Sequence, residues 1–359
     1  MSLPASSTVD PQALQRYVAS LFAAHGVPQP DAERTAECLV EADLRGVASH
    51  GVGRVPIYTE RLRRGLVKAR PELALKPLTP VAAQLDADNG LGFVAATRAM
   101  DEAVERARQF GIGMVWIHGS NHFGMAASYL LQAVRAGYAA FVFTNASRAM
   151  PIWGGRTPFL GTSPFAFAAP GGLSQPPVVL DMATSVVARG KIRRAAQKGE
   201  PIPAGWALDA QGNPTTDAAA GYEGLILPLG GPKGSGLSLM MEVLGGVMSG
   251  AAFGGEVRNQ YSDFETPQDV GHCMLALQPG LAVGEGDYRR RMDELVARAK
   301  ACPRLDAEQE ILMPGEPEAR IERERRLHGI PLPAEDLAML RQEGERVGLR
   351  AAFLEVAPA

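Results

Sequence analysis

Three side chains that could bind and protonate a small acid lie close together near the start of the chain. The stretch ASHGVGR, residues 48–54, contains Ser49, His50 and Arg54. If the turn after Gly51 is helical, His50 and Arg54 lie four residues apart and project to the same side. Arginine binds a carboxylate through two parallel hydrogen bonds, and histidine exchanges a proton near neutral pH. The stretch therefore suits a small carboxylic acid, although spacing alone favours a loop histidine beside a solvated arginine.

A second candidate histidine follows a predicted strand in the segment HGSNHFGMAASY. His118 still belongs to that strand, and Ser120 and Asn121 are predicted to cap the helix that follows. His122 then falls in the first helical turn, where the helix dipole disfavours an imidazolium and lowers the pKa of the ring. We expect a neutral histidine at a turn that a ligand approaches. The alternative is an ordinary capped turn with a hydrogen-bonded histidine.

Two glycine-rich loops, at residues 154–164 and 227–236, expose backbone N–H groups that suit a phosphate. Neither loop has the pattern GxxxxGK[ST], and no GxGxxG follows a strand, so the P-loop and Rossmann fingerprints are absent. Taken singly, each loop is better explained as a turn. Asp181 ends a buried strand, where its carboxylate could orient a histidine, contact a ribose or cap a turn.

These candidates sit between two helical chain ends. Apolar periodicity predicts helices over about the first 70 residues, short apolar strands from about residue 80, and helices again after about residue 285. Within the middle part, a buried helix is expected over residues 237–247. The predicted domains are therefore a helical part at 1–78, an α/β part at 79–284, and a helical part at 285–359 that packs on the first.

Composition narrows the possible partners. The 359 residues carry a formal net charge of -3, without the basic stripe and interleaved aromatic residues that nucleic-acid binding needs. Three cysteines without a CxxC pair predict neither a disulfide framework nor a metal site. The apolar tract at 224–250 is interrupted by Lys233 and Glu242, so we expect no membrane span. With no secretion signal at the first residues, a soluble cytoplasmic protein is expected.

Eight segments in the same order resemble the type 2 malate/L-lactate dehydrogenase family over nearly the whole chain. They include DLRGVASHGVGRVPIY, SNHFGMAASYLLQA, FLGTSPFAFAAP, VLDMATSVVARGKI and LPLGGPKGSGLSLMMEVL. The family also contains ureidoglycolate and sulfolactate dehydrogenases, diketogulonate reductase and the piperideine/pyrroline-2-carboxylate reductases. The resemblance implies a non-Rossmann α/β fold like that of sulfolactate dehydrogenase, with a sheet domain for NAD or NADP beside a helical domain built from both chain ends. It also implies a homodimer with the active site near the interface.

The resemblance assigns roles to the candidate residues. His50 would donate the proton with support from Ser49, and Arg54 would hold the substrate carboxylate. His122 would lie near the nicotinamide, and which histidine moves the proton stays open. Thr162 would touch the substrate, and Arg148 would receive a second carboxylate or a cofactor phosphate. The residues implied to line the cofactor are His122, Leu180, Asp181, Met182, Gly231, Pro232, Lys233, Gly234, Met313, Pro314, Gly315 and Glu316.

The implied reaction moves a hydride between nicotinamide and C2 of a small 2-hydroxy or 2-oxo acid of the malate or lactate type. The alternative is NADPH-dependent reduction of cyclic imine carboxylates. The imine reductases of this family carry an aspartate after their ATS segment. This chain reads ATSVVARGKI there, with Arg189 and Lys191 and no acid, so the 2-hydroxy acid is the favoured substrate.

Overall fold

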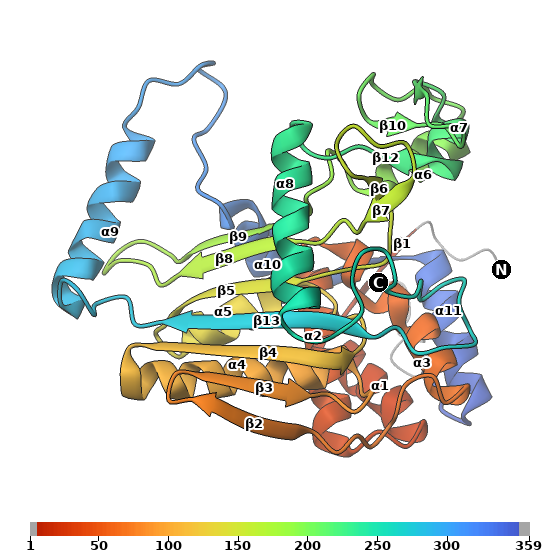
Figure 1. Cartoon of the computed structure of the whole chain (residues 1–359), viewed down its shortest axis with the longest axis horizontal. Coiled ribbons are helices and arrows are strands. Elements are labelled where there is room, and N and C mark those ends of the chain that lie inside the picture. Colours follow the sequence, from red (N-terminus) through yellow and green to blue (C-terminus); the bar gives the residue numbers. More distant parts are fainter. Residues whose placement is uncertain (1–5, 352–359) are drawn as a thin grey trace.

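A seven-stranded mixed sheet forms the centre of the protein in the computed structural model, which describes residues 6–351 (Figure 1). In spatial order its strands are β2 (Ala74–Thr79), β3 (Ala82–Asp86), β4 (Ile112–Ser120), β13 (Val270–Leu277), β5 (Ala139–Thr144), β8 (Phe165–Ala169) and β9 (Val178–Met182). Within the described chain β3 and β4 are the one parallel pair of this sheet. A mostly antiparallel sheet differs from a doubly wound Rossmann sheet, and the predicted non-Rossmann α/β class is confirmed.

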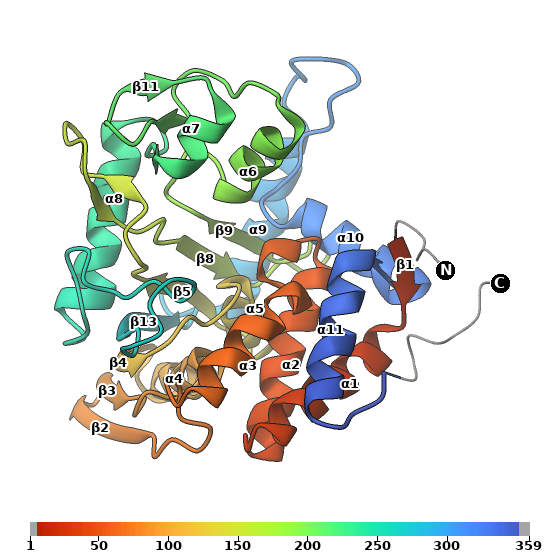
Figure 2. The ribbon, with the colours of Figure 1, turned by 90° about the vertical axis from the view of Figure 1, so that its right-hand side faces the viewer.

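Helices pack on both faces of this sheet. Helices α4 (Gly92–Phe110) and α5 (Ala127–Arg135) lie on one face, and the views in Figures 1 and 2 place α8 (Pro232–Met241) on the other. Helix α8 continues into a π-helix, η3 (Glu242–Val247), so the predicted helix at 237–247 is present. It is not fully buried as expected, because its outer side chains Met240 and Val247 are 49% and 52% exposed.

Both chain ends contribute to one helical layer (Figure 2). Helices α1 (Pro11–Ala24), α2 (Gln29–Leu44) and α3 (Val55–Arg63) pack with α10 (Glu316–His328) and α11 (Ala334–Arg346). Strand β1 (Ser6–Val9) pairs antiparallel with β14 (Ile330–Pro333). The sheet already begins in β2, so the boundary expected at residue 79 falls inside that edge strand.

Helix α9 (Glu285–Lys300) lies apart from this layer (Figure 1). The Asp293 carboxylate accepts hydrogen bonds from the N–H groups of Leu173, Ser174 and Gln175, which ties α9 to the turn between β8 and β9. Of its own residues, Val296 is the one that is buried. The expectation that everything after residue 285 packs on the N-terminal helices is therefore wrong for α9, because its polar sequence gives it little apolar surface to bury there.

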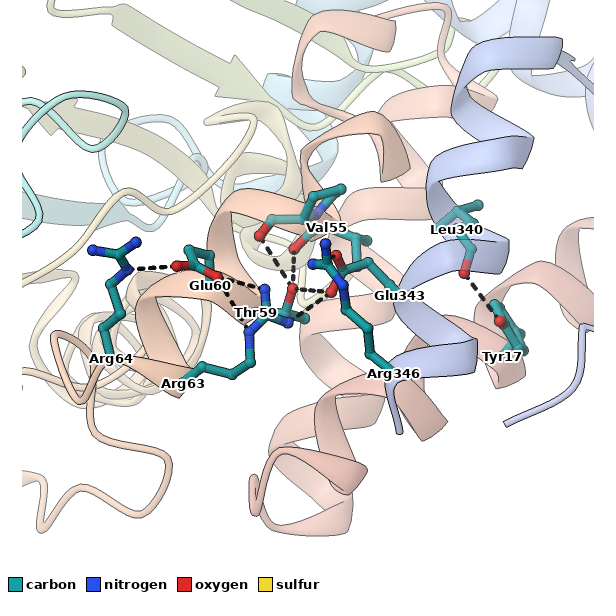
Figure 3. A network of polar contacts seen from close by, with 10 residues as sticks. Tyr17, Val55, Thr59, Glu60, Arg63, Arg64, Leu340, Glu343 and Arg346 are labelled. Atoms are coloured by element: carbon teal, nitrogen blue, oxygen red, sulfur yellow. Dashed lines mark hydrogen bonds and ion pairs between the residues drawn. The ribbon is translucent and has the colours of Figure 1, made fainter. Parts of the chain in front are cut away.

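A buried carboxylate joins α3 to α11 (Figure 3). Glu343, 2% exposed, accepts hydrogen bonds from Thr59 Oγ1 at 2.8 Å, Arg63 at 2.9 Å and Arg346 at 2.6 Å. The Tyr17 hydroxyl of α1 donates to the Leu340 carbonyl of α11 at 3.1 Å. Buried carboxylates need such partners because desolvation is otherwise too costly. The network fixes α3, and the stretch ASHGVGR leads directly into the first turn of that helix.

A small subdomain stands above the β9 edge of the sheet, with a core of its own (Figures 1 and 2). It consists of β6 (Met150–Pro151), β7 (Pro158–Leu160), α6 (Arg189–Lys198), β10 (Ala207–Leu208), β11 (Pro214–Thr215), α7 (Ala218–Glu223) and β12 (Leu225–Ile226). Between residues 6 and 351, no helix combines the length and apolarity that crossing a bilayer requires.

Candidate active site

The stretch ASHGVGR folds as two short 3₁₀ turns, η1 (Ala48–His50) and η2 (Val52–Arg54). The turn after Gly51 is helical, but Gly51 itself is extended, with φ -89° and ψ -160°, so His50 and Arg54 do not lie on one continuous helix. The reason lies beneath the turn, where the buried Asp43 carboxylate of α2 accepts the Val52 N–H at 2.8 Å. A Cβ on Gly51 would stand 2.0 Å from Asp43 Oδ1, so glycine is required by close packing.

The two candidate histidines meet face to face. Their rings stack with centroids 5.7 Å apart and an interplanar angle of 14°. His122 comes from the loop between β4 and α5, and α5 begins only at Ala127, so its expected place in a first helical turn is wrong. The Asn121 side chain does not cap that helix but donates to the Gly90 carbonyl at 2.9 Å. Ser120 Oγ contacts His272 Nε2 at 2.9 Å instead.

Hydrogen bonds define the protonation of His122. Its Nδ1 accepts the Gly124 N–H at 3.2 Å and lies 2.7 Å from the Tyr58 hydroxyl. Because an N–H group donates to Nδ1, the neutral ring carries its proton on Nε2. The backbone N–H of His122 donates to Gln268 Oε1 at 3.1 Å. The backbone N–H and the ring Nδ1 of His122 are therefore both hydrogen-bonded, which fixes the orientation of the imidazole.

Arg54 lies beside both histidines. Its Nε donates to the Ser49 carbonyl and its Nη1 to the Tyr261 hydroxyl. Burial, together with the Arg54 charge, lowers the pKa of His50 to about 3. Burial followed by the charges of Arg54 and His50 holds the pKa of His122 well below its ordinary value. Both rings are thus neutral at physiological pH, and for His122 the cause is burial rather than the helix dipole that the sequence suggested.

His50 opens onto a cavity of about 570 Å³ between the helical layer and the sheet. Its wall is formed by the loop before α5, the end of β9 and the segment before α10. Of the predicted site residues, those that line it are His50, Thr162, Leu180, Asp181, Met313, Pro314 and Gly315. Arg45 was not predicted and also lines it. A largely apolar cleft with a few polar groups is the usual form of a small-molecule site.

A family model described as malate/L-lactate dehydrogenase matches residues 9–341. The chain belongs to the malate/L-lactate dehydrogenase family. It is similar to the (2R)-3-sulfolactate dehydrogenase (NADP(+)) of Chromohalobacter salexigens, with 42% identity over 71% of this chain and 76% of the relative. It is 33% identical to the ureidoglycolate dehydrogenase (NAD(+)) of Escherichia coli strain K12, over 89% of this chain and 91% of that one.

Among solved structures, the sulfolactate dehydrogenase from Methanocaldococcus jannaschii superposes with a TM-score of 0.91 and 36% identity. The alignment covers 96% of this chain and 99% of that one. The resemblance inferred from the eight segments is confirmed, and the protein is an oxidoreductase of the 2-hydroxy-acid dehydrogenase class.

Several residues expected at the cofactor do not line the cavity of this malate/L-lactate dehydrogenase family member. They are His122, Met182, Gly231, Pro232, Lys233, Gly234 and Glu316. The Glu316 carboxylate accepts the Met313 N–H at 3.1 Å and forms an ion pair with Lys300. Glu316 therefore helps to hold Met313, which does line the cavity. Arg148 opens on a separate polar cavity of about 680 Å³ that it shares with Arg258.

Asp181 has two contacts that bear on its role. It lines the cavity, and its Oδ2 accepts the Ala127 N–H at 2.8 Å, so it caps the helix α5. Burial raises the pKa of this carboxyl to about 6, a shift that the Ala127 N–H and the charge of Arg45 partly offset. A carboxyl held at a helix N-terminus is favourably placed for the helix dipole. Of the roles considered from sequence, capping is the one that its hydrogen bond demonstrates.

Tyr58, Tyr261 and Asp43 were missed by sequence reasoning. Tyr58 carried a usable signal, because it follows Arg54 by four residues on an expected helix and so shares its face. Tyr261 lies 207 residues after Arg54, and Asp43 precedes the turn on a different helix. Neither position has a local pattern that points to the site.

Proposed function

We propose that the protein moves a hydride between a nicotinamide cofactor, NAD or NADP, and C2 of a small 2-hydroxy or 2-oxo acid of the malate or lactate type. The observation that carries this proposal is the stacked pair His50 and His122, with Arg54 beside both. A cation next to two neutral imidazoles suits a carboxylate whose neighbouring oxygen gains or loses a proton. Relatives named for NADP(+) and for NAD(+) support both cofactors.

The cavity has features that fit a nicotinamide. Met125, Leu180 and Leu312 give it apolar walls suited to a flat aromatic ring. Pro314 lies along β9, where its carbonyl accepts the Val179 N–H at 2.9 Å, and Gly315 has φ +90° with no room for a Cβ beside Val179. The bound cofactor would supply or accept the hydride, with Leu180, Asp181, Met313 and Gly315 among the residues that hold it.

We assign proton transfer to His50, with Ser49 in support. Ser49 Oγ lies 2.9 Å from His50 Nδ1, which leaves Nε2 for the substrate oxygen. A carboxylate bound to Arg54 offsets the charge that lowers the pKa of His50, so substrate binding raises that pKa toward its ordinary value. Positioned acid–base groups of this kind contribute about 10²- to 10⁴-fold to the rate. Thr162 would contact the substrate from the cavity wall.

Reduction of cyclic imine carboxylates is the second candidate. Within residues 6–351, the Ser49 hydroxyl has His50 as its hydrogen-bond partner and no carboxylate beyond it. A serine–histidine pair without a third, acidic member agrees with the missing acid after the ATS segment. This observation favours the 2-hydroxy acid over the imine.

The test follows the absorbance of NADH and NADPH with purified protein against a panel of acids. The panel holds 2-oxo acids with methyl, carboxymethyl and sulfomethyl groups on C2, and a cyclic imine carboxylate. We expect oxidation with at least one 2-oxo acid, and faster oxidation than with the imine. If neither NADH nor NADPH is oxidised with any member of the panel, the dehydrogenase proposal is refuted. If the imine is the best substrate, the alternative is favoured.

Arg148 keeps its proposed role of binding a second substrate carboxylate or a cofactor phosphate. Arg148 lines a polar cavity together with Arg258, and Glu256, Asp263 and Asp269 line the same cavity. Arg148→Ala should therefore lower activity more on dicarboxylic than on monocarboxylic acids, or more with NADPH than with NADH. If Arg148→Ala lowers activity equally on both kinds of acid and equally with both cofactors, Arg148 binds neither a second carboxylate nor a cofactor phosphate.

We also propose a homodimer in the cytoplasm. The outer face of α8 and η3 exposes a contiguous set of large apolar side chains, and such faces mark association surfaces. Its members are Leu239, Met240, Val243, Val247 and Met248. Light scattering should give twice the chain mass, and Val247→Lys should shift it toward the monomer while Leu305→Lys, on an exposed loop, does not. A monomeric parent protein would refute the dimer.

The described cysteines are unpaired, as in a reducing compartment such as the cytoplasm.

A further inference from the structure

The loop at residues 258–268, between η3 and β13, is attached to α3 by a buried arginine. Arg61 is 1% exposed, and its Nη1 donates to the Asp263 carbonyl at 2.7 Å and to the Gln260 carbonyl at 3.4 Å. Its Nη2 donates to the Thr266 carbonyl at 3.2 Å. Carbonyl groups that converge on one guanidinium fix the backbone of the loop relative to the helix.

The same face of the helix reaches the active site at two more points. Arg54, Tyr58 and Arg61 follow one another at the spacing that places side chains on one helical face. Tyr58 contacts His122 Nδ1, and Arg54 donates to the hydroxyl of Tyr261 from the anchored loop. The Arg54 guanidinium carbon also lies 5.5 Å from the centroid of the Tyr261 ring. The loop therefore delivers Tyr261 to the residue that we assign to the substrate carboxylate.

The remaining N–H groups of Arg54 are free for a ligand. Its Nε is used by the Ser49 carbonyl and one Nη1 hydrogen by Tyr261, while Nη2 has no partner in the described chain. A guanidinium has five N–H groups, so three remain, one on Nη1 and two on Nη2. Two such groups bind a carboxylate in parallel.

The Tyr261 side chain is not needed to shape its own loop. Tyr261 is 52% exposed. The Asn259 side chain accepts the Tyr261 N–H at 2.8 Å, and the Asp263 carboxylate accepts the Glu265 and Thr266 N–H groups at 3.1 Å. Backbone and short polar side chains therefore define the loop, and the phenol is available for Arg54.

We propose that Tyr261 is a positioning residue for substrate recognition, which holds the Arg54 guanidinium so that its free N–H groups face the substrate carboxylate. The proposal rests on the proposed function of Arg54 as the carboxylate ligand. An arginine side chain has several rotatable bonds, and a fixed orientation removes part of the entropy that carboxylate binding would otherwise lose. Loss of the phenol hydroxyl should therefore weaken carboxylate binding and leave cofactor binding unchanged.

The experiment compares the parent protein with Tyr261→Phe, which keeps the ring, and Tyr261→Leu, which removes it. Tyr222→Phe is the matched control, because Arg189 lies over the Tyr222 ring at 5.1 Å, outside the residues that line the cavity. We expect Tyr261→Phe to raise KM for the 2-oxo acid about tenfold, the effect of losing roughly one hydrogen bond to a charged group, with kcat within about twofold. Tyr261→Leu should raise KM further, and Tyr222→Phe should change nothing.

Two binding measurements separate this proposal from the proposed function. Calorimetry with oxamate, an unreactive analogue of a 2-oxo acid, measures carboxylate binding to the complex with NADH without any turnover. Weaker oxamate binding by Tyr261→Phe, with an unchanged Kd for NADH and an unchanged Tm, supports the proposal. Equal oxamate affinity and KM in parent and variant, while the parent oxidises NADH, overturns it and leaves the proposed function standing. A parent that oxidises neither NADH nor NADPH with any 2-oxo acid of the panel overturns the proposed function, and this proposal with it.

Discussion

Gly51→Ala tests whether the active-site turn depends on contact with the Asp43 carboxyl. Gly51 has φ -89° and ψ -160°, an extended conformation that alanine adopts without strain. Its new Cβ would lie 2.0 Å from Asp43 Oδ1 and 2.3 Å from Cγ, whereas ordinary contacts begin at 3.4 Å. The turn and the carboxyl must therefore move apart by about 1 Å or more. Any effect of this substitution comes from that clash, because backbone strain is absent.

The expected losses follow from the displacement. Overpacking of a close-packed site costs about 1–3 kcal/mol, and a weakened hydrogen bond from the Val52 N–H to Asp43 adds about 1 kcal/mol. The free energy of unfolding should therefore fall by roughly 2–4 kcal/mol. His50 and Arg54 lie on either side of Gly51, and a misplacement of about 1 Å costs on the order of 100-fold in rate. We expect kcat/KM to fall by about that factor.

Denaturant unfolding and steady-state kinetics measure the two effects, and a second substitution gives the decisive comparison. Asp43→Ala removes the atoms that the new Cβ meets, so the double variant should be less destabilised than the sum of its single variants by at least about 1 kcal/mol. Gly190→Ala is the control, because a Cβ there has no neighbour within 4 Å. Strict additivity, or a Gly51→Ala variant with parental kcat/KM, would show that the clash does not control the turn.

Three further outcomes follow from the buried ionisable groups. His50→Ala should lower kcat by about 10²- to 10⁴-fold with an unchanged Kd for NADH, whereas a larger kcat loss in His122→Ala would transfer the proton role to His122. Burial and the negative charge of Asp336 raise the pKa of Asp43 to about 7, so the folded state loses stability as pH rises from about 4 to 7, and Asp43→Asn should flatten that decline in urea titrations. With the pKa of His50 at about 3, kcat/KM for 2-hydroxy-acid oxidation should show no loss from its protonation between pH 5 and 7; an acid limb that persists in the parent and vanishes in a His50 variant would contradict this.

Local sequence patterns predicted the order of helices, strands and helices, because apolar periodicity is a local property. Local patterns failed to predict helix boundaries where a side chain forms its hydrogen bond with a residue far away in the sequence. Asn121 is a good helix cap by type, yet its side chain binds the Gly90 carbonyl, and the helix begins at Ala127. Likewise, the chain is extended at Gly51, next to the point where the Asp43 carboxyl of α2 accepts the Val52 N–H.

The composition of the candidate site follows the same division. His50, His122 and Arg54 were selected by residue type, order and family resemblance, and the structure brings them together. Tyr261 reaches Arg54 across 207 residues, from a loop whose position depends on the buried Arg61. A single sequence contains no periodicity at that separation. Such a contact can be identified only from the three-dimensional structure, in which the loop packs against α3.

The electrostatics of the site connect these residues into one sequence of events. Without substrate, burial and the Arg54 charge keep His50 neutral. Burial is the largest cause of the low pKa of His50, and the Arg54 charge is the second. A substrate carboxylate on Arg54 cancels most of that contribution, so His50 gains its proton more readily once the acid is bound. In this arrangement one guanidinium couples substrate recognition to proton uptake by His50, and Tyr261 contributes by orienting that guanidinium for substrate binding.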